Sequence, residues 1–371
     1  MPPPAARMAW RGHVPDSSTK QHPGLPPAAD KPSVRIRHPV SHAFVGTRGD
    51  NAAEYHDNDF VWETLCAAGQ EVIRRQQLEA STARPGADET PPASHDWEEF
   101  HAQHSLGRFF KEKRYLPIEF PQLCTPGVTI GEVGCGCGSA LIPVLRDNPT
   151  ATAVACDVSG TAIQVFRDAA MPGAGIDSRR IRLSVNDFPN SSPFEDGSLD
   201  MAMIIFTLSA FHPNDMKRVV AAVRRGLKPG GLALVRDYGL YDMAQVRMYA
   251  CMHSRRRQCI QVITADSRSR SHSRSHSRSH SRSHSHTTSP AHPQLRFHGS
   301  QLADPDHLVY RRPDGTLSHF FDIDALTDLF ETAGFRTEKA KYCTVSLRNK
   351  KKDLAMNRVF VHGEFSVSTQ P

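Results

Sequence analysis

The sequence contains no run of eighteen or more apolar residues, so no segment is long enough to cross a bilayer as a helix. The first residues, MPPPAARMAWRGHVP, lack the apolar core of a secretory signal. The eight cysteines are scattered and form no C-x-x-C pairs, which argues against a disulfide framework and against a structural zinc site. From these absences we expect a cytoplasmic protein with no membrane contact and no bound metal.

Residues 1–42 also have few acidic and few large apolar side chains, and we predict that they form a disordered tail. Because this tail contains several arginines, organelle targeting is the alternative to a plain tail. The whole chain has 371 residues, of which 39% are hydrophobic, and this is enough for one large domain with appendages. The net charge of +6 favours a polyanionic partner.

Residues 43–127 are expected to form an N-terminal extension that contributes to cofactor and RNA binding. It contains an aromatic and basic segment, DWEEFHAQHSLGRFFKEKRYLPIEF. From residue 128 to 365, short apolar segments typical of buried strands alternate with amphipathic helical segments. A late helix, DIDALTDLFETAGF, is followed by two more strand patterns, KYCTVSL and NRVFVHGEF. The pattern predicts a Rossmann-like α/β domain with a seven-stranded sheet, helices on both faces and an antiparallel hairpin at one edge.

A low-complexity tract interrupts the predicted domain. Residues 267–286 repeat the letters SRSH, and a segment of this kind cannot form a packed core. We therefore predict a surface insertion at about 253–305. The alternatives are a metal-binding histidine tract and an RNA-binding Arg/Ser tract.

The main chemical signal is the motif Glu132-Val-Gly134-Cys-Gly136-Cys-Gly138 between a predicted strand and a predicted helix. Glycines allow a tight turn and the close approach of a ligand, and the helix start offers free N–H groups. Asp157 ends the second strand, where its carboxylate can accept hydrogen bonds from both hydroxyls of a ribose. Asp187 and Phe188 end the third strand and suit an adenine. Each aspartate could instead be a helix N-cap, which is common.

Nicotinamide dinucleotides are the rival ligands, because their binding folds use a similar glycine motif. The order G-x-G-x-G and the LKPGG turn before the fifth strand favour S-adenosylmethionine instead. With the ETAGF ending of the late helix, these features resemble a class I methyltransferase.

Several longer motifs are more specific: HDWEEFHAQHSLGRFFKEKRYLPIEFPQL, EVGCGCGSALIPVL, IIFTLSAFHPNDM, LKPGGLALVRDYGLYDMAQVRM, YRRPDGTLSHFF and NRVFVHGEF. Together they resemble the eukaryotic tRNA N3-methylcytidine methyltransferases, from about Trp97 to Phe365. The resemblance implies methyl transfer from S-adenosylmethionine to N3 of a cytosine in the anticodon loop of tRNA. It also implies a helper protein, such as an aminoacyl-tRNA synthetase. We expect the enzyme itself to be a monomer.

Carried over by position, the resemblance and the glycine motif imply a set of cofactor contacts: Trp97, His101, Gly134, Gly136, Gly138, Asp157, Asp187, Phe188 and Ile205. Three positions depart from the family pattern. His101 stands where the family has a tyrosine, Gly131 where the first strand has a large aliphatic residue, and Leu317 where DGT is followed by an arginine. The last departure is expected to weaken an RNA contact.

The chemistry suggests which residues serve the substrate. Cytosine N3 carries an in-plane lone pair, so its methylation needs no prior removal of a proton, and the base must be unpaired. The product ring is cationic, and Asp237 is the candidate carboxylate that would stabilise it. We expect base stacking from Phe109 and Tyr238, and phosphate contacts from the basic residues Lys111, Lys113, Arg114, Arg236 and Arg247. The alternative is a purely structural role, in which Phe109 is a core residue and Arg236 and Asp237 form an internal ion pair.

Two other functions fit the same residues less fully. The first is a class I methyltransferase that acts on a small molecule or a protein. The second is a catalytically silent tRNA-binding scaffold, which the departures at His101 and Leu317 motivate.

Overall fold

The computed structural model describes residues 56–82, 94–104, 111–188, 190–246, 301–304, 307–349 and 354–369. The predicted tail at 1–42 and the SRSH tract lie outside the described residues, as do Phe109 and Arg247. No helix in the described ranges has the length and apolar character needed to span a bilayer.

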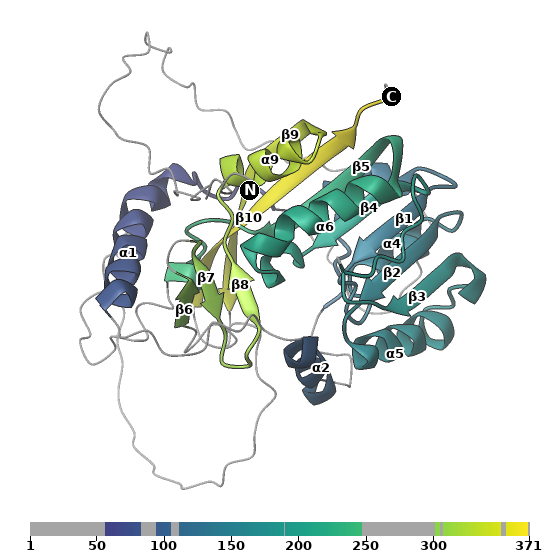
Figure 1. The fold of residues 1–371 in the computed structure, drawn as a ribbon, viewed down its shortest axis with the longest axis horizontal. Coiled ribbons are helices and arrows are strands. Elements are labelled where there is room, and N and C mark those ends of the chain that lie inside the picture. The colour runs from purple at the N-terminus through teal and green to yellow at the C-terminus, as the bar shows by residue number, and fades with distance from the viewer. Residues whose placement is uncertain are drawn as a thin grey trace, which may run out of the picture. The chain divides into compact units, whose positions relative to one another are not determined.

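A seven-stranded sheet forms the centre of the molecule, in the order β3-β2-β1-β4-β5-β10-β9 (Figure 1). Its first five strands are mutually parallel, whereas β10 runs antiparallel to both β5 and β9. This arrangement confirms the predicted Rossmann-like sheet with an antiparallel hairpin at one edge. The strands are β1 (Thr129–Val133), β2 (Thr152–Asp157), β3 (Ile181–Val185), β4 (Leu199–Ile205), β5 (Leu227–Tyr238), β9 (Phe335–Asn349) and β10 (Leu354–Val367).

Helices cover both faces of the sheet, and each face has its own apolar core. One core lies under α6 (Pro213–Gly226) and α9 (Ile323–Thr332), which Figure 1 shows on the same side. In α6 the buried residues include Met216, Val219, Val220 and Val223, at the spacing of one helical face. The other core lies under α3 (Leu116–Glu119), α4 (Leu141–Asp147) and α5 (Gly160–Asp168).

A small antiparallel sheet was not predicted. It consists of β6 (Gln301–Asp304), β7 (Val309–Arg311) and β8 (Leu317–His319), in that order. β6 begins at residue 301, before the predicted end of the insertion at about 305. Tyr310 and Phe320 are fully buried and form the centre of this sheet's own apolar cluster. Strands this short carry little periodic signal, which explains why sequence patterns missed them.

The N-terminal extension begins with a segment that pairs with the sheet edge. Asn58 forms a parallel bridge to Thr344 of β9, and the ring of Trp62 stacks on Tyr342 at a centroid distance of 4.3 Å. Two helices follow, α1 (Glu63–Thr82) and α2 (Ser94–Gln103). The part of the extension that the structure describes, from residue 56 on, is therefore packed on the domain.

Gly131 departs from its family pattern for a steric reason. A Cβ atom placed on it would lie 2.5 Å from Cδ1 of Leu199 and 3.1 Å from Cζ of Phe194. The space of a large aliphatic side chain is thus already filled by two neighbours.

Candidate active site

A cavity opens where the parallel strands end, at the point where the strand order reverses between β1 and β4. Open α/β sheets bind their ligands at this place. Residues at or just after the carboxyl ends of β1, β2, β3, β4 and β5 line the cavity, together with residues of α2 and Lys113. The predicted cofactor residues in its wall are Trp97, His101, Gly134, Gly136, Asp157, Asp187, Phe188 and Ile205.

The glycine turn forms the floor of the cavity, with positive φ angles of 63° at Gly134, 52° at Gly136 and 82° at Gly138. A Cβ atom on Gly136 would meet only His101 Cε1, at 3.8 Å, so this glycine faces open space. The other two glycines face protein instead. Their Cβ atoms would lie 2.3 Å from Thr207 Cγ2 and 2.6 Å from Phe166 Cδ2, respectively. Gly138 therefore serves the packing of α5 and is not part of the cavity wall.

Asp157 is buried at the end of β2 and ties two turns together. Its Oδ2 accepts a hydrogen bond from Gly136 N at 2.8 Å, and its Oδ1 accepts one from Ser159 N at 2.9 Å. Asp187 is exposed on the same cavity and accepts a hydrogen bond from Asn190 Nδ2 at 2.9 Å. The buried ring of Phe188 adds an apolar wall beside it. One cavity thus contains both carboxylates and an aromatic surface.

A buried acid and a lysine occupy the end of the cavity near β1. Burial raises the pKa of Glu132, and Lys113 acts in the opposite direction. The Oε2 atom of Glu132 is buried and has no hydrogen-bond partner among the described residues. Burial also lowers the pKa of Lys113, whose Nζ donates to Ser139 Oγ at 2.5 Å. The sequence predicts a phosphate contact for Lys113 and no role for Glu132, although the position of Glu132 two residues before the first glycine of the motif is a usable signal.

The cavity is also aromatic at this end. Phe206 follows β4 with a φ of 58°, a conformation that non-glycine residues adopt at a cost. Its ring lies 5.2 Å from that of Tyr238, and the Lys113 Nζ lies 5.8 Å from its centroid. Arg312, which is buried in the turn between β7 and β8, also lines this end. Phe206 and Arg312 were missed because their sequence context resembles ordinary core and turn residues.

Asp237 does not reach the cavity, which contradicts its predicted catalytic role. It is fully buried, and its oxygens accept hydrogen bonds from Ser209 N and Tyr238 N, both at 2.9 Å. Burial raises the pKa of Asp237 to about 6. This carboxylate braces the turn after β4 against the end of β5.

Two further residues that the sequence analysis singles out have buried side chains. Arg236 is 3% exposed and forms an ion pair with Glu119 rather than with its neighbour Asp237, so it cannot meet a phosphate. Leu317 is 2% exposed within β8, and the expected weakening of an RNA contact at this position stays a prediction. Lys111 and Arg114 are exposed, as a phosphate contact requires.

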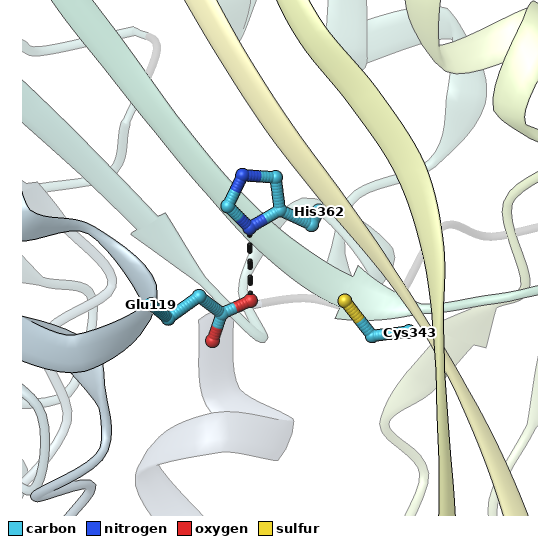
Figure 2. Close-up of side chains that lie close together, drawn as sticks. All are labelled: Glu119, Cys343 and His362. Atoms are coloured by element: carbon cyan, nitrogen blue, oxygen red, sulfur yellow. Dashed lines mark hydrogen bonds and ion pairs between the residues drawn. The ribbon is translucent and has the colours of Figure 1, made fainter. Parts of the chain in front are cut away.

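A cluster of side chains from α3, β9 and β10 resembles a metal-ligand set. Glu119, Cys343 and His362 are buried with their ligand atoms within 4.8 Å of one another, and Figure 2 shows the hydrogen bond between the first and the last. Both imidazole nitrogens of His362 are engaged, however, by Glu119 Oε1 at 3.0 Å and Glu364 Oε1 at 2.8 Å. With the Arg236 guanidinium also on Glu119, we interpret the cluster as an internal network that joins α3 to β5 and β10.

Comparisons with known proteins agree with this geometry. Residues 130–231 match the model of a family described as a methyltransferase domain. The tRNA N(3)-methylcytidine methyltransferase Mettl2 of Drosophila melanogaster is 37% identical over 72% of this chain and 70% of its own length. The human tRNA N(3)-cytidine methyltransferase METTL6 is 29% identical over 81% of this chain and 89% of its own length. O-methyltransferase 3 of Dictyostelium discoideum is 30% identical over 64% of this chain, but the match spans only 43% of that protein.

Proposed function

The chain belongs to the tRNA N3-cytidine methyltransferase family, and we propose that it transfers a methyl group from S-adenosylmethionine to N3 of a cytosine in the anticodon loop of tRNA. One observation carries the proposal. A single cavity joins a glycine floor with acidic strand ends to an aromatic end at Phe206 and Tyr238. The first part suits a nucleoside cofactor and the second suits a base.

The residues of the cavity fit S-adenosylmethionine. Gly136 leaves open the space that a Cβ would fill. Asp157 would hold the ribose hydroxyls, and Asp187 with Phe188 would hold the adenine. The unpaired Oε2 of Glu132 suits the ammonium group of the methionine part, and the Lys113 ammonium suits its carboxylate. When bound, the cofactor supplies an electrophilic methyl group.

The protein's own contribution is to bind and orient the base. Because N3 has a free lone pair, no side chain has to remove a proton, and we assign no general base. Phe206 and Tyr238 would stack against the unpaired cytosine and would exclude water from its N3 edge. Exposed Lys111 and Arg114 would meet the RNA backbone outside the cavity.

The test is methyl transfer to unmodified tRNA by the purified full-length protein, with a candidate aminoacyl-tRNA synthetase added in a parallel reaction. We expect 3-methylcytidine among the products, and its loss in Asp157→Ala. A protein that binds S-adenosylhomocysteine but modifies only a metabolite or another protein would refute the substrate.

Charge reversal separates RNA from small-molecule substrates. Lys111→Glu combined with Arg114→Glu should reduce tRNA methylation strongly and make its dependence on salt shallower, because fewer phosphates are neutralised. The matched control is Arg225→Glu, in the last turn of α6, which should retain activity. Equal activity of the double variant and the control would contradict a polyanionic substrate.

A further inference from the structure

α2 is a short helix that forms one wall of the cavity. It places Trp97 and His101, four residues apart and therefore on one helical face, against the cavity. The His101 ring is the nearest neighbour of the open space over Gly136. A ten-residue helix is only marginally stable alone, so its position depends on how it is attached to the domain.

The attachment is made by Glu98, which is bound to the start of α5. Its Oε2 accepts hydrogen bonds from Ser159 Oγ at 2.6 Å and from Thr161 N at 3.3 Å, and Thr161 Oγ1 donates to its Oε1. These donors lower the pKa of Glu98, so the carboxylate is ionised at neutral pH. A negative charge at this place also interacts favourably with the dipole of α5. Figure 1 shows α2 beside α5.

The same turn reaches the proposed ribose site. Ser159, which binds Glu98 through its hydroxyl, donates its backbone N–H to Asp157 Oδ1 at 2.9 Å. The other oxygen of Asp157 binds Gly136 N. A continuous series of hydrogen bonds therefore connects the helix over the cavity with the carboxylate and the glycine on its floor.

We propose that Glu98 is a positioning residue for the methyl donor: it fastens α2 to α5 so that Trp97 and His101 cover the bound cofactor. The inference rests on the proposed function, because it takes the cavity as the cofactor site. Glu98 itself does not line the cavity, and it acts through Ser159, Thr161 and the helix that carries it.

The experiment compares Glu98→Gln with Glu99→Gln. Glu99 is the next residue on the same helix, is exposed, and among the described residues hydrogen-bonds within α2, to Gln103. We expect Glu98→Gln to raise the KM for S-adenosylmethionine and the Kd for S-adenosylhomocysteine about tenfold, equivalent to about 1.4 kcal/mol. The kcat at saturating cofactor should change less than about twofold, and Glu99→Gln should match the wild type. Glu98→Asp, which retains the charge, should recover part of the affinity.

Three outcomes decide the inference. Unchanged Kd in Glu98→Gln, with normal binding by the wild type, would overturn it alone. A loss of kcat that parallels a lower melting temperature would also overturn it, because the role would then be general stability. If the wild type itself bound no S-adenosylhomocysteine, the proposed function and this inference would both fall.

Discussion

Gly136→Ala tests the cofactor site most directly, because two effects of the added methyl group can be separated. The first is backbone strain. At a φ of 52° an alanine costs about 1–2 kcal/mol of folding stability. The second is lost space. The new Cβ would meet no protein atom closer than 3.8 Å, so it would enter the volume that we assign to the ligand.

The magnitude of the binding effect follows from the cost of overfilling a packed site. An added methyl group costs about 1–3 kcal/mol where the neighbours cannot retreat, which corresponds to a Kd about 5- to 150-fold higher. Gly127→Ala is the matched control. Gly127 has a φ of 72°, is exposed, and has no atom within 4 Å of its hypothetical Cβ. It should lose the same stability without any loss of affinity.

The assay combines titration calorimetry with S-adenosylhomocysteine and denaturant unfolding of both variants. The two variants should unfold with similar free energies, and only Gly136→Ala should bind weakly. Wild-type affinity in Gly136→Ala would refute the reasoning, since the glycine would then face no ligand. Equal loss of affinity in Gly127→Ala would show that strain alone was responsible.

Three further predictions concern residues away from the cofactor. Asp237 has a pKa raised by burial to about 6, so ionisation favours the unfolded chain, and this group's contribution to stability falls as pH rises from about 4 to about 6. Asp237→Asn should remove that fall, which amounts to as much as about 3 kcal/mol in the free energy of unfolding measured with denaturant. Parallel pH profiles of the wild type and the variant would contradict this prediction. Glu119→Gln removes the negative charge that pairs with the buried Arg236 and should lower the free energy of unfolding by about 3–5 kcal/mol. A loss below about 1 kcal/mol would argue against the internal network of Glu119, Arg236 and His362. Gly131→Ala meets Leu199 Cδ1 and should cost about 1–3 kcal/mol while methyl transfer at 25 °C persists, whereas wild-type stability would show that the site has spare room.

The sheet and the cofactor wall could be predicted from the sequence because their signals are local. Alternating apolar segments gave the parallel strands, and an acidic residue at a strand end, such as Asp157, marks the carboxyl edge of the sheet. The orientation of the side chain at a strand end is not a local property. Arg236, Asp237 and Tyr238 are consecutive, yet only Tyr238 faces the cavity, while the two charged residues are buried among groups from distant segments.

Contacts between distant segments also explain the missed residues. Arg312 reaches the cavity only because β7 and β8 form a small separate sheet, and strands of three residues leave no periodic pattern. Lys113 lies in a basic segment of the sequence that is typical of a phosphate-binding surface. In the structure, however, it donates a hydrogen bond to Ser139 and interacts electrostatically with Glu132.

The pairing of the extension with β9 has a consequence for how the protein behaves in solution. β9 is the last strand of the seven, and Asp59 N donates to Thr344 O at 2.9 Å while Thr344 N donates to Asp57 O at 3.0 Å. An unpaired outer strand is a template on which a second molecule can add. A version shortened to begin at residue 63 would expose these backbone groups on β9, and light scattering would detect the oligomers that we expect this deletion to produce.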